Sequence, residues 1–169
     1  GDSWEQASGD LSKTLLNATA GSTVHVAAGE YKPTLNFKGE NSNPKEFRFK
    51  IAGGVNLLGG YPASGNGERD PQTNVTSLNG QIDDGSSVYT IAYVTLGDQM
   101  AVVDGFTFKN GNGENGEHYG DFSGGAGAII LKGGSEAEGG SPAGMGLRLA
   151  NCTFENNTAA WGGALKLQR

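Results

Sequence analysis

The sequence predicts an all-β chain whose strands stack as a parallel β-solenoid, with one short helix near the N-terminus. Three observations lead to this prediction. Helical spacing of apolar residues occurs once, the other apolar residues fall in short runs between Gly, Asn and Asp, and a segment of the C-terminal half recurs. With 30 Gly and 5 Pro in 169 residues, the chain is rich in turn formers but below the level typical of disorder.

The first predicted element is a helix over residues 10–20. Three leucines follow Asp10 at helical spacing, and Gly21 stands where a helix needs a left-handed stop. An uncovered solenoid end exposes strand edges and apolar core, so we expect residues 1–22 to form a cap in which Trp4 and the leucines cover the core. The leucines are Leu11, Leu15 and Leu16.

Residues 23–169 are predicted to form the coils, with long loop insertions. Short β-type runs bounded by turn residues replace the helical pattern here. Before the repeat, the predicted strands are residues 23–27, 47–51, 55–58, 88–91 and 93–96. The polar stretches 36–45 and 63–74 are too long for tight hairpins and are predicted to be surface loops.

The repeat appears when the chain is shifted by 46 residues, which lays residues 101–110 on 147–156. The apolar positions of the two copies superpose, as stacked coils require. The predicted inward pairs are Val103 and Leu149, Phe106 and Cys152, and Phe108 and Phe154. Gly105 and Asn151 occupy a corner that tolerates left-handed backbone.

A second shared element follows each copy of the repeat. Gly-Gly-Ala occurs within residues 124–129 and again within 162–165. Two Gly-rich stretches, residues 113–123 and 133–144, interrupt the unit. Without them the unit has a length of twenty-odd residues, which suits one coil of a β-solenoid.

These motifs resemble a known family. Phe-Glu-Asn-Asn at 154–157, followed by Gly-Gly-Ala-Leu at 162–165, resembles the paired Phe-x-x-Asn and Gly-Gly-Ala-Ile motifs of the polymorphic outer-membrane protein repeats. The first copy departs from the pattern, because Gly111 stands where the second Asn belongs. The wider pattern is similar to secreted bacterial proteins with the pectin-lyase-like fold. It is carried by Trp4 and by residues 21–33, 53–61, 69–71 and 104–108.

The resemblance implies a right-handed, single-stranded parallel β-helix at the bacterial outer surface or outside the cell. It also assigns a set of residues to the structural repeat. They are Gly105, Phe108, Gly124, Gly125, Asn151, Phe154, Asn157, Gly162 and Gly163. Residues 162–169 read as a strand with no cap after it, so we expect further coils of a longer chain to be a partner of this segment.

Composition excludes several classes of function. The net charge of −6 and the lack of a basic cluster argue against nucleic acid as a partner. No apolar stretch approaches the ~20 residues of a membrane-spanning helix. The single Cys152 allows neither an internal disulfide nor a zinc site and is predicted to be a small buried strand residue.

Aromatic rings are candidate binding residues because they offer an apolar face to the C–H surface of a sugar. Most of the candidates lie in the longest insertion. They are His118, Tyr119, Phe122 and, outside the insertion, Trp161, and Tyr61 is a further aromatic residue near a loop. For each aromatic ring, packing in the core or at a corner is the alternative. Acidic side chains of the same insertion could hold calcium, with a plain polar loop as the alternative, since their spacing fits no EF-hand. They are Glu114, Glu117 and Asp121. No other cofactor is expected.

Catalytic candidates are few. Asp83 and Asp84 could act as a carboxylate pair on a glycosidic bond, but neighbouring strand residues face opposite ways and the surrounding composition is that of a turn. His25 is interpreted as structural and Lys132 as a surface charge. The sequence therefore leans away from an enzyme.

Two functional hypotheses stay open. The first is a non-catalytic, adhesin-like scaffold outside the cell or on its surface, which binds a glycan or a cell-surface protein. The alternative is the N-terminal part of a polysaccharide lyase or glycoside hydrolase, which rests on fold analogy. Basic residues beside several carboxylates on one face of the coils would favour the enzyme, and a ladder of Val, Thr and Asn would favour the scaffold.

Overall fold

The computed structural model describes residues 3–114, 126–132 and 146–168. Within these ranges the structure is mostly strand, with one α-helix, α1 (Leu11–Asn17), and two short 3-10 helices, η1 (Trp4–Gln6) and η2 (Pro44–Glu46). None of the helices in the described ranges is long and apolar enough to cross a membrane.

Twelve strands form three four-stranded sheets, and every pairing in them is parallel. The first sheet contains β1 (Thr23–Ala27), β4 (Asn56–Tyr61), β7 (Ala101–Asp104) and β11 (Leu147–Ala150). The second contains β2 (Gly29–Tyr31), β5 (Thr76–Asn79), β8 (Phe106–Lys109) and β12 (Thr153–Glu155). The third contains β3 (Phe49–Ile51), β6 (Ala92–Thr95), β10 (Ile129–Lys132) and β14 (Leu165–Gln168). A smaller pair joins β9 (Asn112–Gly113) to β13 (Thr158–Ala159).

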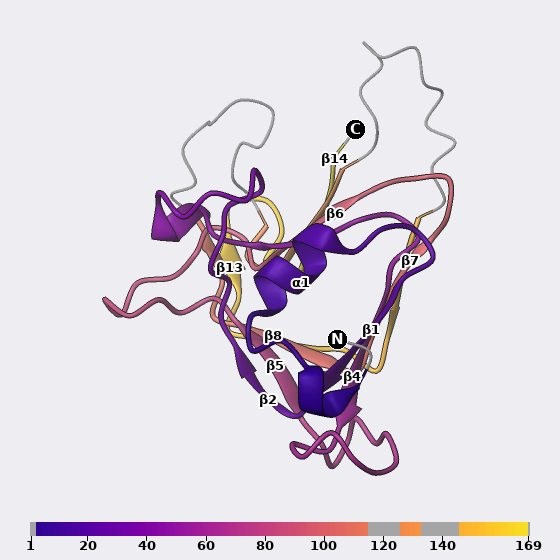
Figure 1. Ribbon diagram of the computed structural model, residues 1–169. Helices are drawn as coiled ribbons and strands as arrows, with labels where there is room; N and C mark the ends of the chain where they lie inside the picture. The colour runs from indigo at the N-terminus through magenta and orange to yellow at the C-terminus, as the bar shows by residue number, and fades with distance from the viewer. Residues whose placement is uncertain (1–2, 115–125, 133–145, 169) are drawn as a thin grey trace.

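Neighbouring strands in each sheet follow the order of the chain. The chain therefore passes through the first, second and third sheets in turn and then begins the next round beside the previous one. Figure 1 shows the sheets arranged around a common centre, with α1 lying over it at one end. The prediction of a mostly β chain with parallel sheets and one helix is confirmed.

The predicted shift of 46 residues is the pairing register of the last two rounds. Ala101 pairs with Leu147 and Thr107 with Thr153 at this spacing. The spacing falls to 36 residues where Ile129 pairs with Leu165. The earlier round is thus longer between β9 and β10, at the position of the predicted interruption over residues 113–123. Gly162 pairs with Ala126, so matching the Gly-Gly pairs letter by letter gives the wrong register.

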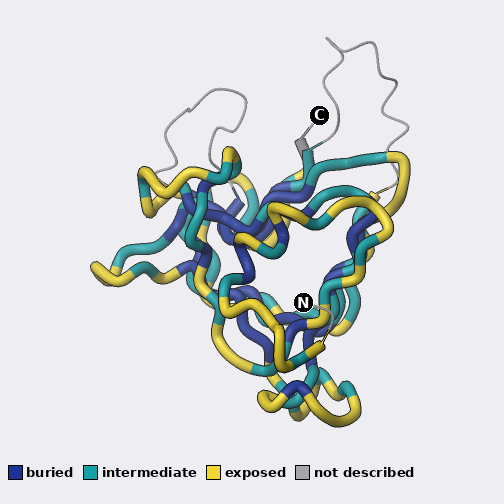
Figure 2. Tube along the Cα trace, in the orientation of Figure 1, coloured by how far each residue is buried: buried dark blue, intermediate teal, exposed yellow. Residues whose placement is uncertain are grey.

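Inward side chains of successive rounds stack to form the core. Leu57 and Val103 are fully buried in the first sheet, with Leu149 next to them in register and partly buried. In the second sheet the ring of Phe108 stacks on that of Phe154, with centroids 5.3 Å apart. Figure 2 shows buried residues gathered in the strands around the common centre and exposed residues mainly in the loops. The predicted inward pairs of the repeat are therefore confirmed at these two levels.

Left-handed residues form the corners between the first and second sheets. Gly105 has a φ of +83° and Asn151 a φ of +49°, as predicted. A Cβ at Gly105 would lie 2.9 Å from the carbonyl oxygen of Gly59, so this corner also needs the absence of a side chain. Asn110 and Asn156 form a second left-handed pair after β8 and β12. That conformation was not predicted for these two asparagines.

The predicted helix over residues 10–20 is too long. Helix α1 ends at Asn17, and Ala18 already has extended dihedrals. Leu15 is buried as expected, but Leu16 is 38 % exposed and lies against the turn at Gly39 instead of the core. The left-handed Gly21 belongs to the turn before β1, where its N–H donates to the carbonyl of Gly54.

Several strand predictions also need correction. Residues 23–27 form β1 as predicted, and the predictions 47–51, 55–58 and 93–96 shift by one to three residues at their ends. Residues 88–91 form no strand, although Val88 and Ile91 are fully buried. They line an inner corner, and an apolar run by itself does not separate such a corner from a strand. Cys152, predicted in a strand, is half-buried in the turn between β11 and β12, and burial raises the pKa of its thiol.

Candidate functional site

A cavity of about 900 Å³ lies at the end of the molecule where α1 covers the first round. Its walls come from η1, α1, β1 and the turn at residues 63–65. Leu11, Val24 and Val26 give it an apolar floor at the edge of the core. Hydroxyl and amide side chains of the N-terminal segment and of α1 supply the polar part. They are Ser3, Ser8, Thr14 and Asn17.

Three aromatic rings lie beside this cavity. The rings of His25 and Tyr61 stack, with centroids 4.8 Å apart and an interplanar angle of 26°. The ring of Trp4 meets the same Tyr61 in a tilted arrangement at 5.4 Å. Trp4 and His25 themselves line the cavity. His25 is exposed, and the other two rings are half-buried, so parts of their surfaces face solvent. We call Trp4, His25 and Tyr61 the aromatic row.

Sheet register and one glycine hold the aromatic row together. Tyr61, at the end of β4, is the Cα partner of Ala27 on β1, the strand that carries His25. Gly65 has a φ of +78°, and a Cβ there would overlap the ring of Trp4. The turn after β4 therefore accepts the indole only because residue 65 has no side chain.

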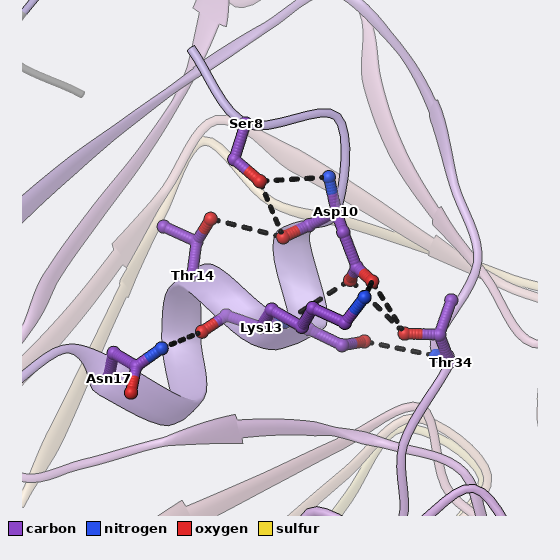
Figure 3. Close-up of polar contacts among 7 residues, drawn as sticks. Ser8, Asp10, Lys13, Thr14, Asn17 and Thr34 are labelled. Carbon is purple, nitrogen blue, oxygen red and sulfur yellow. Dashed lines mark hydrogen bonds and ion pairs between the residues drawn. The ribbon is translucent and has the colours of Figure 1, made fainter. Parts of the chain in front are cut away.

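The polar wall of the cavity is anchored at the start of α1. Asp10 caps the helix by accepting from the backbone N–H of Lys13 at 3.1 Å, and it also accepts from the hydroxyl of Thr34 (Figure 3). Burial by itself would raise the pKa of Asp10, but the hydrogen bonds from Lys13 and Thr34 outweigh it and lower that pKa. Ser12 accepts from the backbone N–H of Thr34, which ties the helix to the segment after β2.

The arrangement suits a ligand with both apolar and hydroxyl surfaces. Partly exposed rings can stack on the C–H face of a sugar. The hydroxyl groups of Ser8 and Thr14 and the amide of Asn17 already donate to backbone carbonyls, so their oxygen lone pairs are what they offer to the hydroxyl groups of a sugar. The described residues contain no group of three or more His, Cys, Asp or Glu placed to hold a metal ion.

Most of the predicted binding residues lie outside the described ranges. These are His118, Tyr119, Phe122, Glu117 and Asp121, together with the repeat residues Gly124 and Gly125. Of the two that are described, Trp161 is 80 % exposed, and Glu114 is exposed with its backbone N–H bonded to Asn112 Oδ1. Trp161 and Glu114 follow the paired strands β13 and β9, so they leave the sheets at the same corner.

The candidate carboxylates Asp83 and Asp84 lie in a solvent-exposed turn, as expected. Asp84 accepts from the backbone N–H and the hydroxyl of Ser86, and these bonds lower the pKa of Asp84. Asp83 is fully exposed and bonds Lys32. The two carboxylates therefore serve turn formation and a surface ion pair.

A basic residue does lie beside carboxylates on the outer face of the second sheet. Lys109 Nζ is 2.7 Å from Glu30, and Glu155 is the Cα partner of Lys109 on β12. Hydrogen bonds from Lys109 and Asn79 lower the pKa of Glu30. An ammonium group paired in this way has no lone pair with which to remove a proton from a substrate. The rest of this outer face is a ladder of hydroxyl groups, from Ser77, Thr107 and Thr153.

Sequence reasoning missed the aromatic row as a unit. It interpreted His25 as structural, Trp4 as part of the core cover and Tyr61 as an aromatic residue near a loop. Nothing local in the sequence links the three. The pairing of β1 with β4 brings His25 to Tyr61, and the turn at Gly65 accepts the ring of Trp4 beside them. Comparison with protein-family models, with curated proteins and with solved structures gives no match for the chain.

Proposed function

We propose that the chain winds as a right-handed parallel β-helix related to the polymorphic outer-membrane protein repeats. The order of the strands in three parallel sheets supports a winding chain, and parallel crossovers are right-handed in almost all proteins. The motif residues also contact one another. Asn157 donates to the carbonyl of Phe108 and accepts from the N–H of Gly111, each at 2.9 Å. A Cβ at Gly163 would lie 2.8 Å from the carbonyl oxygen of Asn157.

We further propose that this β-helix is a non-catalytic, adhesin-like scaffold that binds a glycan outside the cell or at the bacterial outer surface. The observation that carries the proposal is the aromatic row beside the cavity under α1. Ring faces and hydroxyl groups together match the alternating C–H and O–H surface of a neutral sugar. Trp161 offers a second exposed ring at the opposite end of the chain.

The two tryptophans allow the sites to be tested one at a time, because the chain has no others. Trp161→Phe leaves Trp4 as the only indole, and Trp4→Phe leaves Trp161. Titration with neutral oligosaccharides should change the fluorescence of the Trp161→Phe variant and leave the Trp4→Phe variant unchanged. A response confined to the Trp4→Phe variant would move the binding site to Trp161. No response from either variant across a broad panel of neutral and acidic glycans would contradict glycan binding.

The second candidate function is a carbohydrate-active enzyme, favoured by Lys109 beside Glu30 and Glu155. Incubation with acidic and neutral polysaccharides, with and without calcium, followed by sizing of the polymer, separates the two functions. We expect the polymers to keep their length. Shortened polymers that persist with Lys109→Met would place catalysis elsewhere, and loss of shortening in that variant would identify the outer face of the second sheet.

A further inference from the structure

A polar cluster on the outer face of the second sheet brings an amine and an amide together. Asn79 of β5 and Lys109 of β8 are Cα partners on neighbouring parallel strands. Glu30 of β2 contacts both: one carboxylate oxygen lies 2.7 Å from Lys109 Nζ, and the other accepts a 2.9 Å hydrogen bond from Asn79 Nδ2. A single carboxylate therefore bridges a primary amine and a side-chain amide from adjacent rounds of the chain.

The carbonyl group of Asn79 is also polarised. Its Oδ1 accepts the backbone N–H of Gln81 at 3.0 Å and Nδ2 of Asn110 at 2.9 Å. Two donors aimed at one carbonyl oxygen stabilise the negative charge that develops there during attack on the carbon, as in an oxyanion hole. Asn79 is only 4 % exposed, so competing water has little access to the amide.

We propose that Lys109 and Asn79 join in an intramolecular isopeptide bond, with Glu30 as the catalytic proton carrier. Lys109 Nζ attacks Cγ of Asn79 after passing a proton to Glu30. The Nζ–Cγ bond forms and the Cγ–Nδ2 bond breaks. Over the whole step, Nζ passes two of its three protons by way of Glu30 to Nδ2, which leaves as an ammonium ion. The chain loses one positive charge and needs no oxidant, cofactor or second substrate.

Because Lys109 and Glu30 start as an ion pair, the transfer of a proton from the ammonium group to the carboxylate costs free energy. Hydrogen bonds from Lys109 and Asn79 hold the pKa of Glu30 below its usual range, and the charge of Lys32 acts in the same direction. We therefore expect the bond to form slowly. Once formed, it ties β5 to β8 covalently in a chain whose single cysteine allows no internal disulfide.

Intact-mass spectrometry of the purified 169-residue chain tests the proposal. After several days at mildly alkaline pH, we expect a mass about 17 Da below that of the sequence, from the loss of one ammonia. Proteolysis should then release a branched peptide that joins the segments of Lys109 and Asn79. Lys109→Arg and Glu30→Gln should release no branched peptide. Lys50→Arg on β3, in a different sheet, is the matched control and should lose ammonia as the unchanged chain does.

A competing reaction gives the same mass loss and must be separated. Asn79 precedes Gly80, and an Asn-Gly pair can cyclise to a succinimide with release of ammonia. That product forms without Lys109 and joins no second peptide. The sequence has four further Asn-Gly pairs, so a mass loss by itself does not locate the reaction. Linear peptides alone from the unchanged chain would overturn the proposal, and so would the full sequence mass in the unchanged, folded chain. The branched peptide from the unchanged chain decides the question whether or not the variants fold.

Discussion

Single residues at the corners decide where one sheet ends and the next begins. Gly105 and Asn151 adopt left-handed backbone at equivalent positions of two rounds. The same corner is tied together by Arg69, which donates through Nε to the carbonyl of Gly59 and pairs through Nη2 with Asp104 at 2.8 Å. Backbone strain and a partly buried ion pair thus meet within a few ångströms.

Two glycines allow the free-energy cost of left-handed backbone to be separated from the cost of a steric clash. Gly105 and Gly85 have the same φ of +83°, but a Cβ meets the Gly59 carbonyl oxygen and Arg69 in the first case and open space in the second. We expect Gly85→Ala to lower the free energy of unfolding by about 1–2 kcal/mol, the usual cost of left-handed backbone with a side chain. Gly105→Ala should cost more, because backbone must move as well. Urea unfolding measures both, and equal losses would show that the corner has room for a methyl group.

Acid should weaken the corner through Asp104. Burial by itself would raise the pKa of Asp104, but hydrogen bonds from Arg69 and Asn151 outweigh it and lower that pKa. A carboxyl group with a lowered folded-state pKa contributes stability above its unfolded pKa of about 3.9 and loses it as the pH falls through the folded value. Asp104→Asn should therefore reduce the loss of stability below about pH 4. Urea midpoints from neutral pH downwards test this, and an unchanged pH profile would contradict it.

At the scale of elements, α1 depends on its cap and on one face. Asp10 satisfies the first turn, and Leu11 and Leu15 are buried where the helix packs against β3. The helix has only seven residues, too few to be stable alone, so packing must supply most of its stability. The cavity lies between this helix and β1, which makes the position of α1 decisive for the candidate site.

Adjacent leucines of α1 test this packing. Leu15 is 2 % exposed and Leu16 is 38 % exposed. Leu15→Ala should lower the free energy of unfolding by about 2–5 kcal/mol, as for other core leucines. Leu16→Ala should change it by less than about 1 kcal/mol, because much of the side chain already contacts water. Chemical denaturation with circular dichroism gives both values. Similar losses would mean that the two faces of α1 are covered equally.

Over the whole molecule, stability depends on how many neighbours each strand has. Strands β4, β5, β7 and β8 pair on both edges, whereas β11 and β12 pair on one edge within the described ranges. Leu149 and Phe154 at that end are only partly buried, while Val103 and Phe108 beneath them are fully buried. Strands with fewer neighbours and less burial have less to break when they open, so different parts of the chain can open separately.

Amide hydrogen exchange should reveal this gradient. In the 169-residue chain, we expect β7 and β8 to exchange more slowly than β11 and β12, because opening an inner strand breaks two rows of hydrogen bonds. Mass spectrometry of peptides from the two regions, which have similar sequences, provides a matched comparison. Equal protection in both regions would mean that the rounds unfold as one cooperative unit.

The sequence by itself determined the β character, the shift of 46 residues, the inward alternation and the first left-handed corner. These features are local or repeated, because side chains alternate along a strand and corners need particular backbone angles. The bounds of the elements were harder to predict. Residues 88–91 were predicted to be a strand but form a buried corner, and α1 ends three residues before the predicted end of the helix. Apolar patterning reports burial, and burial does not fix dihedral angles.

Only the tertiary structure decided which distant residues meet. Paired residues are 30 positions apart at Thr76 and Phe106 but 47 apart at Glu30 and Ser77. Because the loops differ in length, no single shift of the sequence reveals the strand pairing in the early rounds. The aromatic row and the cluster around Glu30 both depend on that hidden register. Residue types alone gave no reason to join His25 to Tyr61, or Lys109 to Asn79. Strand pairing brings them together because neighbouring strands satisfy each other's backbone hydrogen bonds and so place distant side chains next to one another on one face of a sheet.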